Sequence, residues 1–362
     1  MRVRASILKL KPYEWEPSRR DIAEQMGIPE GEILRFDMNT VPVRPEKALK
    51  KFAEMVDRLP VNEYPDPSYR ELKEALSEYV KVPPENIEIT VGADEALDIL
   101  AKTFVDPGTC ALVASPTYSM YRISVELLDG RIIEVARRPD FSDNVEALIE
   151  QCKRPEARMV FLCSPNNPTG NLSKREDVVR LLETVECAVV VDEAYAEFAG
   201  ESLVDLTGKY ENLIIVRTFS KAFGMAGVRI GYMVAHPETI RLLSKARPPN
   251  SVSTISLTLA KLALENRDEI LPKIEEIKRE RERLAGRLAE LPNVEVYPSQ
   301  ANFILARFEQ ADKVYSELLK RGMVLRRVSG PLLENCLRIT VLDRKANDRL
   351  ITSLKEVLGV KS

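Results

Sequence analysis

Hydrophobic positions follow two alternating patterns between residues 69 and 245. Short apolar runs, several of them apolar along their whole length and rich in Val and Ile, predict strands at 87–91, 111–115, 131–135, 158–164, 188–194, 213–219 and 229–235. Amphipathic segments between them predict helices, at 69–79, 94–104, 117–127 and 173–184. Strands that are apolar on both sides suit the middle of a sheet with helices on both faces. The pattern therefore predicts an α/β fold with a mostly parallel sheet.

The pattern changes after about residue 246. Isoleucine and leucine recur at three- and four-residue steps over 267–291, which predicts one long helix whose KRERER run forms a solvated face. Short strands and helices then alternate, with a strand at 303–308, a helix near 311–321, strands in MVLRR and CLRITV, and a last helix near 344–358. This part predicts a second, smaller α/β domain.

The domain division follows from these changes. Residues 1–45 carry many prolines and weak periodicity, so they are expected to form an arm that packs on the small domain or on a partner subunit. Residues 46–245 are expected to form the large domain, and residues 246–362 the small one. The total of 362 residues agrees with two domains of roughly 150 residues each.

Composition excludes several classes of protein. A net charge of -3 disfavours nucleic-acid binding through bulk positive charge. No signal peptide and no run of about 18 apolar residues occurs, so a cytoplasmic location without a membrane span is expected. One histidine, His236, and scattered cysteines predict no metal site and reduced thiols. The five cysteines are Cys110, Cys152, Cys163, Cys187 and Cys336.

The segment RTFSKAFGMAGVRIGY, residues 217–232, carries the first candidate chemistry. Lys221 follows two hydroxyl residues, Thr218 and Ser220, and Arg229 comes eight residues later. A lysine that forms a Schiff base must reach an aldehyde while hydroxyls and a guanidinium hold a phosphate. A Ser-Lys pair alone would indicate only an exposed loop lysine, but the full string favours a phosphate-bearing aldehyde as ligand.

Two further groups of polar residues stand at predicted strand ends. SPNNPTG (164–170) provides Asn167 on a Pro-Gly turn, and VVVDEAY (189–195) provides Asp192 and Tyr195. Taken singly, these are a good turn and a common helix cap. Together they occupy the carboxyl ends of parallel strands, where open α/β sheets bind ligands.

The segment TVGADEAL (90–97) leads from a strand into a helix through Gly92, Ala93 and Asp94. Free backbone N–H groups at a helix start suit a phosphate, and Asp94 also suits a helix cap. PTYSMY (116–121) adds Tyr118, an aromatic residue near the same predicted edge.

These motifs, in this order, resemble the fold-type I enzymes that use pyridoxal 5′-phosphate (PLP), and among them the class I/II aminotransferases, over nearly the whole chain. The resemblance implies that Lys221 holds the cofactor as a Schiff base and later moves a proton between the substrate carbon and the cofactor. It implies that Asp192 pairs with the pyridine nitrogen, and that Asn167 and Tyr195 bind the ring 3′ oxygen. The residues implied to complete the cofactor site are Gly92, Ala93, Asp94, Thr218, Ser220 and Arg229 at the phosphate and Tyr118 stacked on the ring.

EYPDPSYREL (63–72), RGMVLRR and CLRITV extend the similarity to the histidinol-phosphate aminotransferase family. This implies a homodimer in which Tyr64 reaches the cofactor phosphate of the partner subunit. Arg338 is implied to bind the substrate carboxylate or phosphate, and Arg326 to add a second anionic contact. The implied reaction, a step of histidine biosynthesis, converts histidinol phosphate and 2-oxoglutarate to imidazole acetol phosphate and glutamate.

Three segments differ from the usual family pattern. Thr40 stands where an acidic residue is expected, and Asn250 where a tyrosine is usual. LDR follows CLRITV, where a glycine-containing turn is common. These segments lie where the family recognises the side chain of its substrate. Two alternatives therefore stay open: an aminotransferase for aromatic or other amino acids, and a threonine-phosphate decarboxylase. A non-catalytic regulator is disfavoured because no helix-turn-helix pattern precedes residue 46. A nicotinamide dehydrogenase is disfavoured because no GxGxxG follows a strand.

Overall fold

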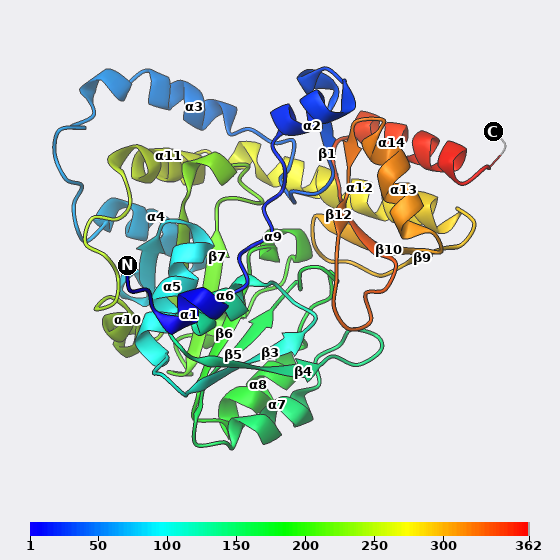
Figure 1. Ribbon diagram of the computed structural model, residues 1–362. Coiled ribbons are helices and arrows are strands. Elements are labelled where there is room, and N and C mark those ends of the chain that lie inside the picture. The colour runs from blue at the N-terminus through cyan, green and yellow to red at the C-terminus, as the bar shows by residue number, and fades with distance from the viewer. Residues whose placement is uncertain (361–362) are drawn as a thin grey trace.

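A seven-stranded sheet forms the centre of the protein (Figure 1), whose computed structural model describes residues 1–360. The strand order is β2-β8-β7-β6-β5-β3-β4. The strands are β2 (Ile87–Thr90), β3 (Cys110–Ser115), β4 (Arg131–Ala136), β5 (Ala157–Cys163), β6 (Ala188–Asp192), β7 (Leu213–Thr218) and β8 (Gly231–Ala235). β8 runs antiparallel to both of its neighbours, and the other pairs are parallel. The predicted α/β class with a mostly parallel sheet is confirmed.

Both faces of the middle of this sheet are buried, which explains why strands such as β6 are apolar along most of their length. In β6, Val189 and Val191 join one hydrophobic core, whereas Val190 joins the other. Successive side chains of a strand point to opposite faces, so each face needs its own helices. One core includes α5 (Gly92–Phe104), α6 (Met120–Glu126) and α10 (Pro237–Leu243); the other includes α4 (Arg70–Val80), α7 (Val145–Cys152), α8 (Arg175–Thr184), α11 (Thr254–Glu265) and α12 (Leu271–Ala289).

A second sheet has the order β12-β13-β10-β9. Its elements are β9 (Val294–Val296), β10 (Phe303–Phe308), β12 (Arg326–Arg327) and β13 (Cys336–Thr340), with α13 (Ala311–Leu319) and α14 (Arg344–Val357) packed nearby. The long helix α12 contacts α9 (Ala196–Ala199) at one side and β9, β10 and α14 at the other. Helix α12 is shorter than the helix predicted over 267–291, because its first residues form a 3-10 turn at Arg267–Glu269 instead. Pro272 sits in its first turn, where no N–H is needed.

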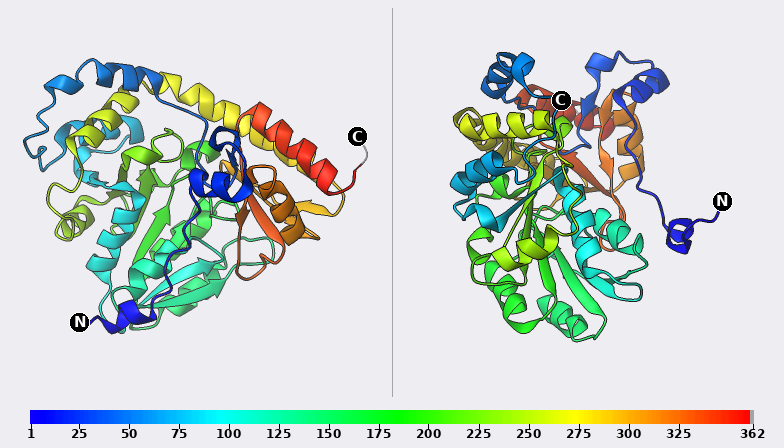
Figure 2. Two further views of the ribbon diagram at one scale, coloured as in Figure 1. Left: turned by 45° about the horizontal axis from the view of Figure 1, so that its top comes forward. Right: turned by 90° about the vertical axis from the view of Figure 1, so that its left-hand side faces the viewer.

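The N-terminal segment forms elements that its weak periodicity did not reveal. They are α1 (Ala5–Lys9), α2 (Arg19–Met26), the 3-10 turn η1 (Glu30–Glu32) and β1 (Leu34–Arg35). A capping box between Ser18 and Asp21 starts α2. β1 pairs in parallel with β11 (Met323–Val324), next to the second sheet, and Figure 2 shows the chain before α2 running along the outside of the fold to α1. Two elements follow before α4, the helix α3 (Glu46–Ala53), which packs on α11, and the 3-10 turn η2 (Val56–Arg58).

Within residues 1–360, no helix combines the length and the apolar character that crossing a membrane would require.

Candidate active site

Lys221 lies in the turn that follows β7, at the carboxyl edge of the large sheet. Its Nζ donates to the Met38 carbonyl oxygen at 3.4 Å and lies 5.7 Å from the centre of the Tyr195 ring. Burial, helped by the positive charge of Arg338, lowers the pKa of Lys221 to about 8. About a tenth of this amine is therefore neutral at pH 7, far more than for an ordinary lysine, and the neutral form is the one that acts as a nucleophile or base.

Asp192 ends β6 as a buried carboxylate. Its Oδ2 accepts from the Tyr121 hydroxyl at 2.7 Å, and its Oδ1 accepts from the backbone N–H of Ala194 at 3.0 Å. Burial raises the pKa of Asp192 to about 6, although these two hydrogen bonds oppose the rise. No lysine or arginine of residues 1–360 forms an ion pair with it. A cationic ring nitrogen is the kind of ligand group that such a carboxylate would stabilise.

Asn167 and Arg338 meet although 171 residues separate them. Arg338 Nη1 donates to Asn167 Oδ1 at 2.6 Å, and Arg338 Nη2 donates to the Asp37 carbonyl oxygen. Because the Asn167 carbonyl oxygen is taken by the guanidinium, its Nδ2 is the group left to donate to a ligand. β13 carries Arg338, so a strand of the second sheet reaches the site of the first.

Arg229 stands over the start of α5. Its Nη2 forms a 3.0 Å ion pair with Asp94, and its Nη1 donates to the Ser220 hydroxyl at 3.4 Å. Thr218 donates to the same Ser220 oxygen at 3.0 Å. A guanidinium, two hydroxyls and a helix start thus converge, which is a donor set that fits a phosphate. Tyr118 borders this set, with its hydroxyl 3.4 Å from Asp94 Oδ1.

Two glycines let the backbone close up around these donors. A Cβ at Gly231 would lie 2.5 Å from the Gly92 carbonyl carbon and 2.8 Å from the Ala93 nitrogen. A Cβ at Gly92, where φ is +72°, would lie 2.7 Å from Arg229 Nη2. Glycine is therefore required at both positions to keep β8, the start of α5 and Arg229 in contact.

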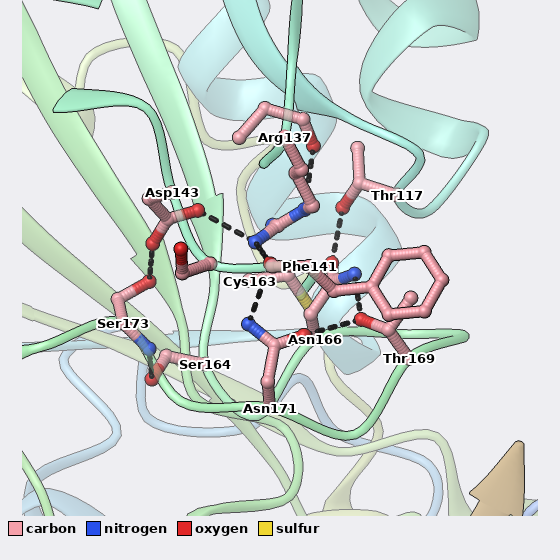
Figure 3. Close-up of polar contacts among 12 residues, drawn as sticks. Thr117, Arg137, Phe141, Asp143, Cys163, Ser164, Asn166, Thr169, Asn171 and Ser173 are labelled. Atoms are coloured by element: carbon pink, nitrogen blue, oxygen red, sulfur yellow. Dashed lines mark hydrogen bonds and ion pairs between the residues drawn. The ribbon is translucent and has the colours of Figure 1, made fainter. Parts of the chain in front are cut away.

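A buried polar network holds the turn that carries Asn167 (Figure 3). Asn166 Nδ2 donates to the Pro116 carbonyl oxygen at 3.1 Å, and Asn166 Oδ1 accepts from the Thr117 hydroxyl at 2.7 Å. Arg137 joins the same neighbourhood through a 2.6 Å ion pair with Asp143, in which both side chains are fully buried or nearly so. The network ties the 164–170 turn to the 115–118 turn, so Asn167 and Tyr118 are fixed relative to each other.

Two predicted site residues take no part in the contacts described above, although Arg326 of β12 lies directly opposite Arg338 on the neighbouring strand β13. Tyr64 is 84% exposed, in the loop between η2 and α4. Arg326 forms a 2.6 Å ion pair with Glu16 of the N-terminal segment, so its charge already has a partner.

Asn39 is a site residue that the sequence analysis did not single out. Its Nδ2 donates to the Tyr195 hydroxyl at 3.0 Å. Its backbone has φ 51°, a left-handed conformation that Asn adopts more readily than most residues. The sequence signal for this residue is the Asn in FDMNTVP (36–42), the segment in which Thr40 departs from the family pattern.

Comparisons with known proteins identify the family of the chain. The family model described as "Aminotransferase class I and II" matches residues 24–354. The chain belongs to the class I and II aminotransferases. As a member of this family it is a PLP-dependent aminotransferase, and the donor set around Lys221, Asp192 and Arg229 fits that cofactor.

Three similar proteins illustrate the breadth of this aminotransferase family. A histidinol-phosphate aminotransferase of Thermoanaerobacter sp. (strain X514) is 40% identical over 90% of this chain and 93% of its own. The structure of the histidinol-phosphate aminotransferase from Sinorhizobium meliloti in complex with PLP matches with TM-score 0.90 and 26% identity, over 99% of this chain and 98% of the other. L-threonine-O-3-phosphate decarboxylase from Porphyromonas gingivalis matches with TM-score 0.80 and 26% identity, over 90% and 100%.

Proposed function

We propose that this aminotransferase converts histidinol phosphate and 2-oxoglutarate to imidazole acetol phosphate and glutamate, in histidine biosynthesis. The relative from Thermoanaerobacter, named for this activity, supports the proposal because the similarity covers nine-tenths of both chains. The observation that carries the chemistry is the meeting of Lys221, Asp192 and the Asn167–Arg338 pair at one sheet edge.

Each residue of the cluster has a proposed role. Bound PLP supplies an electron sink that makes the substrate Cα–H acidic. Asp192 would keep the ring nitrogen protonated, Asn167 and Tyr195 would donate to the ring oxygen, and Tyr118 would pack against the ring. The proposed phosphate ligands are Arg229, Thr218, Ser220 and the backbone at Gly92, Ala93 and Asp94.

Lys221 is proposed to carry both the covalent link to the cofactor and the proton that moves at Cα. When it is not bound to the cofactor, its neutral amine would serve as the base at this carbon. Arg338 would bind the anionic group of the substrate through the N–H groups that Asn167 and Asp37 leave free. Arg326 would add a further anionic contact once its ion pair with Glu16 opens.

Assembly and location complete the proposal. The exposure of Tyr64 supports a homodimer in which this tyrosine reaches the phosphate site of a second copy. We further propose the division into an arm (1–45), a large domain (46–245) and a small domain (246–362), and a cytoplasmic location. The substrates are then small molecules, an amino donor and a 2-oxo acid.

A side-by-side assay tests the reaction. Histidinol phosphate, phenylalanine and threonine phosphate are each supplied with and without 2-oxoglutarate. We expect turnover with histidinol phosphate that depends on 2-oxoglutarate. Turnover of phenylalanine alone would instead establish the aromatic alternative, and carbon dioxide release from threonine phosphate the decarboxylase, which the Porphyromonas structure keeps as the second candidate.

The role of Lys221 is tested separately. Lys221→Ala is expected to abolish turnover and the absorbance of covalently held PLP, whereas Lys245→Ala, at an exposed position, changes neither. Retention of either property in Lys221→Ala would overturn the assignment.

A further inference from the structure

Two of the five cysteines lie against each other. The Sγ atoms of Cys152 and Cys187 are 3.5 Å apart, although 35 residues separate them in the chain. Both are free thiols and both are partly exposed, whereas the other three cysteines are buried. Their wide spacing gave no sign of a pair, which is why the sequence predicted only scattered reduced thiols.

The pair lies at the edge of the large sheet opposite to the active site. Cys152 is the last residue of α7, which leads into β5, and Cys187 is the residue before β6. β5 and β6 are neighbouring parallel strands, with Met159 opposite Ala188, so the segments entering them run side by side. Asp192 stands at the other end of β6. A covalent change at the cysteines therefore leaves the strand ends that carry the catalytic cluster in place.

The two thiols influence each other's acidity. The hydrogen bond with Cys152 lowers the pKa of Cys187, and the same contact, together with burial, raises the pKa of Cys152. Cys187 is thus the thiol that more readily supplies a thiolate, the form that attacks a disulfide.

We propose that Cys152 and Cys187 form a redox-active thiol pair that a low-molecular-weight disulfide oxidises to an intramolecular disulfide. The thiolate of Cys187 attacks one sulfur of the oxidant, which releases one small thiolate and leaves a mixed disulfide on Cys187. The thiolate of Cys152 then attacks the Cys187 sulfur and releases the second small thiolate. The two protons lost by the cysteines go to the two small thiolates, so the protein loses two electrons and the oxidant gains them.

The geometry favours the second step over a lasting mixed disulfide. The sulfurs start 3.5 Å apart and need to approach to about 2.05 Å, a change within reach of side-chain rotation. The new bond closes a segment of 35 residues that contains β5, the Asn167 turn and α8. A bond that closes such a segment reduces the conformational entropy of the unfolded chain and so stabilises the folded protein. For a protein of 362 residues, this stabilisation corresponds to a rise in Tm of about 5 °C.

The test uses the full-length protein with PLP bound, treated with glutathione disulfide. We expect the titratable thiols under denaturing conditions to fall from five to three, and the mass to fall by two hydrogens. Peptide mapping should find the link between Cys152 and Cys187, and Tm should rise by about 5 °C and return with dithiothreitol. Transamination should not change.

Matched variants make the result specific. Cys152→Ser and Cys187→Ser should each lose the Tm shift, and the lone thiol left behind should take up glutathione, whereas Cys336→Ala should keep the shift. Cys152→Ala serves if the serine variant fails to fold. A wild-type protein that keeps five thiols, or that carries glutathione without forming the internal link, would overturn the proposal.

Discussion

The side-chain amide of Asn39 donates a 3.0 Å hydrogen bond to the hydroxyl oxygen of Tyr195. Asn39 is itself held by Thr340 of β13, whose hydroxyl donates to Asn39 Oδ1 at 3.1 Å and accepts from the Asn39 N–H at 3.0 Å. Because the tyrosine oxygen receives this donor, its own proton is free to point toward a ligand. The N-terminal segment and the second sheet thus jointly orient a hydroxyl of the active site.

Asn39→Asp reverses this hydrogen bond without changing the size of the side chain. The new carboxylate would accept the tyrosine proton that the cofactor oxygen is proposed to receive. We expect kcat to fall about tenfold, with the absorbance maximum of bound PLP shifted. The variant is compared with Tyr195→Phe in absorbance and steady-state assays. Unchanged absorbance in both would contradict the role of this pair.

The pH dependence of cofactor uptake reports the pKa of Lys221. Only the neutral amine attacks the PLP aldehyde, so uptake by the cofactor-free protein should speed up with pH and level off above about 8. Arg338→Gln removes a nearby positive charge, which should raise the pKa and move the midpoint upward. Arg327→Gln, at an exposed position, is the control. Stopped-flow absorbance measures the midpoint, and an equal midpoint in all three proteins would count against the charge effect.

Asp192 carries a stability cost in the cofactor-free protein. Its folded pKa of about 6 lies above its ordinary value of 3.8, so the folded state binds the extra proton between these pH values. The free energy of unfolding therefore falls as pH rises through this window and stays lower above it. At neutral pH, cofactor-free Asp192→Asn should be more stable by about 1–3 kcal/mol, and near pH 4 by almost nothing. Urea unfolding at both pH values tests the sign, and a variant that is less stable at neutral pH would refute it.

Gly231→Ala should disrupt the phosphate site. The added methyl group meets the backbone of Gly92 and Ala93, which cannot give way without moving the start of α5. We expect PLP affinity to fall at least about tenfold, corresponding to about 1.4 kcal/mol. Gly227→Ala is the matched control, since a Cβ there meets nothing within 4 Å. Equilibrium titration with PLP compares the two, and equal affinities would show that the close approach is unimportant.

The Arg137–Asp143 pair should support the Asn167 turn. Asp143→Ala leaves the fully buried guanidinium without its carboxylate, which typically costs about 3–5 kcal/mol. Glu146→Ala, in an exposed pair with Arg138, should change the unfolding midpoint little. Urea denaturation measures both variants. A small loss in Asp143→Ala would mean that the remaining hydrogen bonds of Arg137 suffice.

The strands of the large sheet, the fold class and most residues of the proposed catalytic cluster could be predicted from the sequence alone. The β5 and β6 segments are recognisable because burial on both faces requires continuous apolar runs, and that requirement is local. Lys221, Asp192 and Asn167 follow such runs directly, so their shared edge could be inferred from the parallel arrangement alone.

The contacts between segments far apart in the chain became visible only in the folded structure. The contacts of Asn39 with Tyr195, Asn167 with Arg338 and Cys152 with Cys187 join positions 156, 171 and 35 residues apart. The antiparallel direction of β8 and the pairing of β1 with β11 likewise could not be predicted from the local sequence. Such contacts depend on how whole elements pack and in which register, and the apolar pattern of a strand or helix specifies its buried face but not the partner that covers it.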